Sequence, residues 1–146
     1  MARTLITGMS GAGKSTLLEE LALRGYLSVD TDAGAWKISN ELWDEERMTR
    51  LLEENENIVV GGTVENQGKF YDRFDHVVIL SAPVEVLIDR LKTRPNNSYG
   101  KTAAEQADVR RYVIEVEPLL RRGATLELDS RRPTIELADL VERLRT

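Results

Sequence analysis

A glycine-rich stretch near the start of the chain, GMSGAGKST at residues 8–16, carries the residue types that hold a phosphate group. It fits the spacing G-x-x-x-x-G-K-[ST], in which glycines let successive backbone N–H groups converge on one anion. The lysine of such a loop reaches the terminal phosphates of a nucleotide, and the next hydroxyl binds Mg²⁺. The residues predicted to bind the nucleotide here are Gly8, Ser10, Gly11, Ala12, Gly13, Lys14, Ser15 and Thr16.

Two carboxylates follow the second apolar segment, in VDTDAG at residues 29–34. Alternate residues of an extended chain point the same way, so Asp30 and Asp32 can face one cleft. One carboxylate could orient Mg²⁺ together with Ser15, because this ion prefers oxygen ligands. The other could accept the proton of an attacking hydroxyl group. The spacing leaves open which carboxylate has which role, and one of them could instead only cap the next segment.

The elements that must position these residues alternate between short apolar runs and amphipathic ones. Strands are expected at residues 3–7, 26–30, 57–62, 76–82 and 124–129. Helices are expected at residues 14–24, 39–54, 83–94, 102–123 and from 134 onward. Such alternation predicts a three-layer α/β fold with a parallel sheet covered on both faces. Ligands of such sheets bind beyond the carboxyl ends of the strands, where both the glycine loop and the Asp pair fall.

The composition restricts the class of protein further. A chain of 146 residues predicts a single domain over residues 1–146, and a net charge of −5 disfavours nucleic acid and anionic membranes as partners. The absence of cysteine excludes disulfides and thiolate metal sites. No apolar run approaches the ~20 residues of a membrane span, and we expect no signal peptide, because the first residues lead directly into the first expected strand. We therefore expect a cytoplasmic protein that is a monomer or a weak homodimer.

Four stretches, GMSGAGKST, VDTDAG, VVGGTVENQG and DRLKTRPNNSYGKT, occur in this order over most of the chain. Together they resemble the small P-loop kinases, the superfamily of shikimate, gluconate and nucleoside monophosphate kinases. The resemblance implies a P-loop NTPase fold with a five-stranded parallel sheet of order 2-3-1-4-5. It also implies ATP and Mg²⁺ as nucleotide and metal, and transfer of the γ-phosphoryl group to a small-molecule acceptor.

The same resemblance implies roles for individual residues. Asp30 would lie near Mg²⁺. Asp32 would lie at the acceptor hydroxyl and would be a catalytic residue, as would Lys14. Gly61 and Gly62 would line the acceptor pocket. The acceptor-binding segment, at about residues 33–56, reads AGAWKISNELW where a shikimate kinase would show an arginine-bearing pattern. The acceptor is therefore left unidentified.

Cations cluster around a turn-rich loop that resembles the mobile lid of these kinases, at about residues 95–103. Arg90 and Arg94 lie four residues apart on one helix face and are predicted to bind ATP, with Arg94 also catalytic. Lys101 and Arg110 are predicted on the acceptor side. A solvated basic face is the structural alternative for all four residues.

Further residues are predicted at the two ends of the site. Arg131 and Arg132, in DSRRP, fall where the resembling kinases pack the adenine, and Asn66 falls just beyond the glycine pair at the acceptor pocket. Trp36 could stack a planar acceptor or simply pack the core. Lys37 is expected on a salt-bridged outer face, although it could also bind an anionic acceptor.

Three functions remain open at this point. The predicted one is an ATP-dependent kinase of a hydroxyl or phosphate on a small molecule, such as a shikimate-like or gluconate-like compound, a nucleoside or a nucleoside monophosphate. The second is a P-loop ATPase that acts with a macromolecular partner. The third, a polynucleotide 5′-kinase, is disfavoured by the acidic charge balance.

Overall fold

The computed structural model of the chain describes residues 1–39, 41–95 and 98–145. Its central sheet contains five parallel strands in the order β2-β5-β1-β6-β7. These strands are β1 (Arg3–Gly8), β2 (Ser28–Asp30), β5 (Ile58–Gly61), β6 (His76–Ser81) and β7 (Leu126–Asp129). Counted along the chain, this is the predicted order 2-3-1-4-5, so the expected fold class is confirmed.

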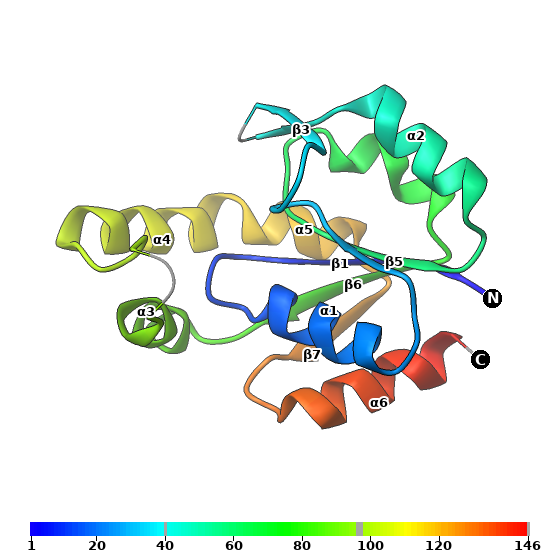
Figure 1. The fold of residues 1–146 in the computed structure, drawn as a ribbon. Helices are drawn as coiled ribbons and strands as arrows, with labels where there is room; N and C mark the ends of the chain where they lie inside the picture. Colours follow the sequence, from blue (N-terminus) through cyan, green and yellow to red (C-terminus); the bar gives the residue numbers. More distant parts are fainter. Residues whose placement is uncertain (40, 96–97, 146) are drawn as a thin grey trace.

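Helices cover both faces of the sheet, as Figure 1 shows, with α2 and η1 above it and α1 and α6 below it. The helices are α1 (Lys14–Leu23), α2 (Glu45–Glu54), η1 (Gln67–Arg73), α3 (Val84–Thr93), α4 (Ala103–Glu115), α5 (Glu117–Gly123) and α6 (Thr134–Arg145). The side chains of neighbouring β1 residues pack against the helices on opposite faces of the sheet, because successive side chains of a strand point to opposite faces. Ile6 packs in the cluster that contains residues of α1 and α6, whereas Leu5 packs with residues of α2 and η1.

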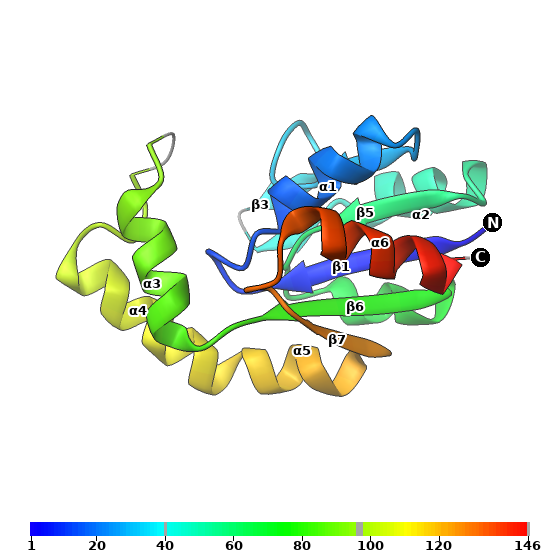
Figure 2. The ribbon, with the colours of Figure 1, turned by 90° about the horizontal axis from the view of Figure 1, so that it is seen from below.

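The carboxyl ends of the strands gather at one edge of the sheet because all five run in the same direction. Gly61 of β5 lies in register with Asp30 of β2 on one side and with Ile6 of β1 on the other. Gly8 at the end of β1 lies in register with Leu80 of β6. Helices α3 and α4 project beyond this edge, next to the loop that follows β1 (Figure 2). The fold therefore brings the glycine loop and the Asp pair to one rim, as the parallel topology predicts.

The acceptor-binding segment differs from the helix predicted over residues 39–54. It begins with a two-stranded antiparallel hairpin, β3 (Lys37–Ser39) and β4 (Leu42–Trp43), and α2 starts only at Glu45. Asp44 is the N-cap of α2, where its side chain accepts a hydrogen bond from the Arg47 N–H. The side chain of Trp43 is fully buried, which fixes the end of the hairpin in the core.

The long helix predicted over residues 102–123 is divided at Val116 into α4 and α5. Pro118 lies in the first turn of α5, a position that needs no backbone donor. The capping box at the start of α4 is formed as predicted, with Thr102 accepting from the Glu105 N–H and the Glu105 side chain accepting from the Thr102 N–H.

Candidate active site

The glycine-rich loop forms the turn between β1 and α1, as its pattern predicts. Gly11 and Gly13 adopt φ angles of 86° and 90°, in the left-handed region that favours glycine. A Cβ atom on Gly11 would also lie only 2.8 Å from the Leu87 carbonyl oxygen. The loop is thus packed against α3 and is directly followed by the first turn of α1, whose unpaired backbone N–H groups can bind an anion.

Lys14 lies across this loop. Its Nζ donates to the carbonyl oxygens of Gly8 and Met9, at 2.6 Å and 3.3 Å. Burial lowers the pKa of Lys14 to about 8, although the negative charges of Asp32 and Asp30 act in the opposite direction. Two positive groups, Lys37 and Arg94, lower this pKa further. Lys14, Arg94 and the Asp pair therefore lie close enough for their charges to act on one another.

Ser15 and Asp30 form the pair expected of a magnesium site. The Ser15 hydroxyl donates to Asp30 Oδ2 at 2.6 Å, and the backbone N–H of Asp32 donates to Asp30 Oδ1 at 3.0 Å. Across the described residues, no three acidic or histidine side chains are grouped to ligate a metal by themselves. One hydroxyl and one carboxylate fit Mg²⁺, which usually keeps several waters and takes the remaining ligands from substrate phosphates.

Asp32 is held by an ion pair that the sequence did not indicate. Lys37 Nζ lies 2.6 Å from Asp32 Oδ1, and the Asp32 side chain remains 52% exposed. The predicted partners of Lys37, on an outer face with the acids of α2, are not its partners in the structure. Lys37 belongs to the candidate site because the hairpin returns it to the carboxyl end of β2.

The glycine pair at the end of β5 has a clear packing reason. A Cβ atom on Gly61 would meet Leu18 of α1 at 2.2 Å, and one on Gly62 would meet the Thr31 hydroxyl at 2.2 Å. That hydroxyl accepts from the Trp43 indole N–H at 3.0 Å. The pair allows α1 and the hairpin to approach β5 closely, and its role in an acceptor pocket stays a prediction.

Thr63, which directly follows the pair, was missed in the sequence. Its hydroxyl donates to the Gly8 carbonyl at 2.6 Å and accepts from the Gly8 N–H at 3.2 Å. The Thr7 hydroxyl lies 3.0 Å away and accepts from the buried Gln67 amide at 3.1 Å. This network fixes the start of the phosphate loop, and a threonine beyond a glycine pair gave no local signal for it.

The side chain of Asn66, which is predicted at the acceptor pocket, is bonded to the hairpin. Its side chain is buried and accepts from the Trp43 N–H at 2.9 Å while donating to the Trp43 carbonyl at 3.1 Å. It also donates to Glu45 at 3.1 Å. Through these bonds the Asn66 amide anchors the hairpin, and its contact with the acceptor stays a prediction.

The cations of the lid region divide into two groups. Arg94 ends α3 as its C-cap, and its Nε is buried without a hydrogen-bond partner among the described residues. Lys101, by contrast, donates to the carbonyl of Arg94 at 2.7 Å and to that of Lys92 at 3.0 Å. Arg110 pairs with Glu85 on α3. Lys101 and Arg110 therefore stabilise α3 and its neighbours in this structure, and their place on the acceptor side stays a prediction. Residues 96 and 97 of the predicted lid lie outside the described residues.

The other arginines predicted to bind ATP, Arg90 near the lid and Arg131 and Arg132 at the adenine, are each held by the protein. Arg90 donates to the Gly11 carbonyl at 3.2 Å and to the Ser130 carbonyl at 2.6 Å, which links the phosphate loop to the β7–α6 turn. Arg131 pairs with Asp129 at 2.7 Å, and Arg132 with its helix neighbour Glu136. Both are exposed, so their stacking on adenine stays a prediction.

This fold and this loop define a P-loop nucleotide-binding domain. Residues 5–111 match the AAA domain family, and the chain belongs to that family. A curated relative, the dephospho-CoA kinase of Deinococcus radiodurans, is 31% identical over an alignment of 121 residues that covers 81% of this chain. The chain spans only about half of that kinase, 54% of its length.

Solved structures share the fold over the whole chain. A shikimate kinase from Acinetobacter baumannii in complex with shikimate has a TM-score of 0.72 at 22% identity, over 99% of this chain and 92% of that one. A deoxyadenosine kinase from M. mycoides with bound dATP has a TM-score of 0.66 at 16% identity, over 100% of both chains. The resemblance to small P-loop kinases is thereby confirmed. In the part of the chain that the structure describes, no helix is both long and apolar enough to cross a membrane.

Proposed function

We propose that the chain transfers the γ-phosphoryl group of ATP to a hydroxyl or phosphate group of a small-molecule acceptor. The observation that supports this best is the contact of Ser15 with Asp30 at 2.6 Å, which joins the phosphate loop to the carboxyl end of β2. Asp32 extends from the same strand end, so a nucleotide on the loop would face a second carboxylate, of which Lys37 holds only one oxygen. A site built only to hold a nucleotide needs no such second carboxylate.

The donor half would be formed by Lys14 and Arg94. On nucleotide binding, Lys14 exchanges the Gly8 and Met9 carbonyls for the β- and γ-phosphate oxygens, which suit its positive charge better. Arg94, at the end of α3, would neutralise charge that develops on the transferred group. Ser15 and Asp30 would hold Mg²⁺, which would supply positive charge against the phosphates of the nucleotide.

The acceptor half would be formed around Asp32. Its ion pair with Lys37 holds one carboxylate oxygen and leaves the other able to accept a hydrogen bond from a hydroxyl group. In phosphoryl transfer, the orientation of that hydroxyl matters more than early removal of its proton. Asp32 would therefore act first as a positioning group for the acceptor and then as the site that receives its proton.

An enzyme assay would identify the acceptor. A coupled ADP-release screen would test shikimate, gluconate, dephospho-CoA, nucleosides, nucleoside monophosphates, aminoglycosides and a 5′-hydroxyl oligonucleotide. We expect ADP release with one small molecule and none with Lys14→Ala. ADP release that needs a macromolecule and no acceptor would favour the partner-dependent ATPase, and release only with the oligonucleotide would favour the polynucleotide kinase. No release under any condition would contradict a phosphotransferase.

A further inference from the structure

A chain of short contacts leads from the phosphate loop through the Asp pair to Lys37. The Ser15 hydroxyl donates to Asp30 Oδ2 at 2.6 Å, and the Asp32 N–H donates to Asp30 Oδ1 at 3.0 Å. Lys37 Nζ then donates to Asp32 Oδ1 at 2.6 Å. The ammonium group of Lys37 therefore lies beside the carboxylate proposed to face the acceptor, at the end of a chain that starts on the phosphate loop.

The hairpin holds the backbone around Lys37 in place. The Trp36 carbonyl accepts from the Asp44 N–H at 2.7 Å, and the Arg47 guanidinium lies over the Trp36 ring, 4.3 Å from its centroid. On the opposite strand, Lys37 is in register with Trp43, whose side chain is fully buried. The position of Lys37 beside the Asp pair is therefore set by the packing of the hairpin.

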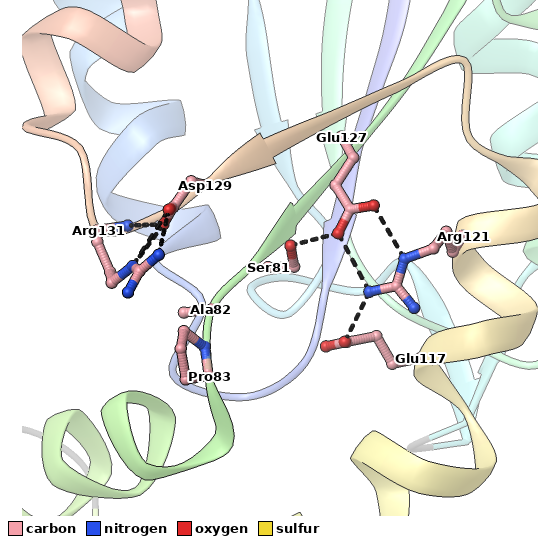
Figure 3. Close-up of a pocket in the computed structure, with 8 residues that line it drawn as sticks. All are labelled: Ser81, Ala82, Pro83, Glu117, Arg121, Glu127, Asp129 and Arg131. Carbon is pink, nitrogen blue, oxygen red and sulfur yellow. Dashed lines mark hydrogen bonds and ion pairs between the residues drawn. The ribbon is translucent and has the colours of Figure 1, made fainter.

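Lys37 has hydrogen-bond donors left for a ligand. An ammonium group has three N–H donors, and among the described residues Lys37 bonds only to Asp32, in an exposed contact. Arg121, next to β7, is a contrasting case. It makes three bonds to Glu117 and Glu127, as Figure 3 shows, so its charge is already used within the protein. Lys37 can bind an anion without giving up its present partner.

The charges around Lys14 indicate which anion Lys37 can reach. The positive charge of Lys37 lowers the pKa of Lys14, and its effect is larger than that of Arg94. The lysine of such a loop reaches the β- and γ-phosphates of the nucleotide. A cation that acts on Lys14 also acts on phosphates bound there, so Lys37 is at least as well placed for this as Arg94.

Building on the proposed function, we propose that Lys37 contacts the γ-phosphate of bound ATP while it keeps its bond to Asp32. The γ-phosphate and the Asp32 carboxylate are both negative and repel each other at short range. An ammonium group bonded to both offsets this repulsion through charge-assisted hydrogen bonds. Lys37 is then a catalytic residue supplied by the hairpin, and it joins the transferred phosphoryl group to the carboxylate that orients the acceptor.

The test is calorimetric titration of the full chain with Mg-ADP and with the magnesium complex of AMP-PNP, an ATP analogue that keeps a γ-phosphate. We expect Lys37→Met to weaken AMP-PNP binding by about tenfold and ADP binding by less than about twofold, because ADP lacks the contacted group. Lys37→Arg keeps the positive charge and should bind AMP-PNP within about threefold of the wild type. Lys69→Met is the matched control, since Lys69 forms an exposed ion pair with Glu45 at 3.1 Å, and it should bind both nucleotides like the wild type.

A double variant separates a direct contact from the loss of the counter-charge of Asp32. In Lys37→Met the unpaired Asp32 carboxylate could itself repel the γ-phosphate, and Asp32→Asn removes that charge. We expect the double variant Asp32→Asn/Lys37→Met to bind AMP-PNP about tenfold more weakly than Asp32→Asn alone. AMP-PNP binding in the double variant that equals binding in Asp32→Asn would overturn the direct contact.

Two results with the single variant would also overturn the proposal. Equal losses for ADP and AMP-PNP would assign Lys37 a structural role in the nucleotide site. Unchanged AMP-PNP binding, with weaker binding of the acceptor found in the screen, would assign Lys37 to an anionic group of that acceptor. Neither titration contains an acceptor, so these results would leave the proposed phosphoryl transfer standing. The expected binding pattern without any transfer in the screen would support the contact of Lys37 and contradict the kinase.

Discussion

Replacing Thr63 with valine would remove the hydroxyl that holds the first residue of the phosphate loop while keeping the shape of the side chain. The one proton of the Thr63 hydroxyl goes to the Gly8 carbonyl at 2.6 Å. The Thr7 hydroxyl, which accepts from Gln67, must then donate to Thr63. The chain of bonds therefore runs in one direction, from the Gln67 amide to the Gly8 carbonyl.

The size of the effect follows from the groups that lose a partner. Thr63→Val removes the acceptor of two donors, the Thr7 hydroxyl and the Gly8 N–H, and the donor to one carbonyl. Each unsatisfied buried group costs about 1–3 kcal/mol, and partial relaxation suggests a total of about 3 kcal/mol. For a chain of this length, that loss corresponds to a melting temperature lower by about 6–12 °C. Since Gly8 also accepts from Lys14, we further expect the KM for ATP to rise by about tenfold.

Denaturant unfolding and ATP titration of three proteins would measure this. Thr63→Ser keeps the hydroxyl and should lie close to the wild type in both quantities, whereas Thr63→Val should be shifted in both. Wild-type stability and KM in Thr63→Val would refute the inference that this hydroxyl network positions the loop. Equal losses in the serine variant would assign the effect to packing of the methyl group.

Three other variants test separate parts of the site. Asp32→Asn should lower kcat by about 10²-fold or more while the Kd for ATP stays unchanged, and intact turnover would remove Asp32 from the acceptor half. Burial lowers the pKa of Lys14 from 10.5 to about 8, so between these pH values the unfolded chain holds this proton more tightly than the folded one. The stability of the wild type relative to Lys14→Met should therefore rise from pH 8 to pH 10.5 by on the order of 2 kcal/mol in denaturant melts, and a flat difference would contradict it. Lys101→Met should lower the melting temperature by about 2–4 °C and raise the KM for ATP, because Lys101 holds the Arg94 carbonyl. Lys101→Arg should have the wild-type value of both quantities. An unchanged KM in Lys101→Met would show that Lys101 does not position Arg94 for ATP.

The donor half of the site could be predicted because its signals are local in the sequence. The loop between Gly8 and Thr16 contains its own glycines, lysine and hydroxyl, and Asp30 lies at the end of a strand that pairs in register with β5. The parallel topology then decides which loops meet at one edge. The capping box at Thr102 could also be predicted from the sequence, because its two partners are three residues apart.

Contacts between distant residues could not be predicted in the same way. Asn66 was expected at the acceptor, but Trp43, 23 residues earlier, occupies its amide. Arg110 was expected there too, but its partner Glu85 lies on another helix. Lys37 was placed on an outer face because the hairpin was interpreted as part of a helix. In each case the deciding interaction depends on which elements become neighbours, which a pattern of residue types does not contain.

The proposed kinase passes the γ-phosphoryl group of ATP to an acceptor and not to water. Phosphorus NMR of the wild-type chain with Mg-ATP and a mixed pool of the candidate acceptors follows that group directly. We expect a new phosphate ester or anhydride resonance that grows in step with ADP and is absent with Lys14→Ala. ADP that accumulates together with inorganic phosphate alone would contradict it.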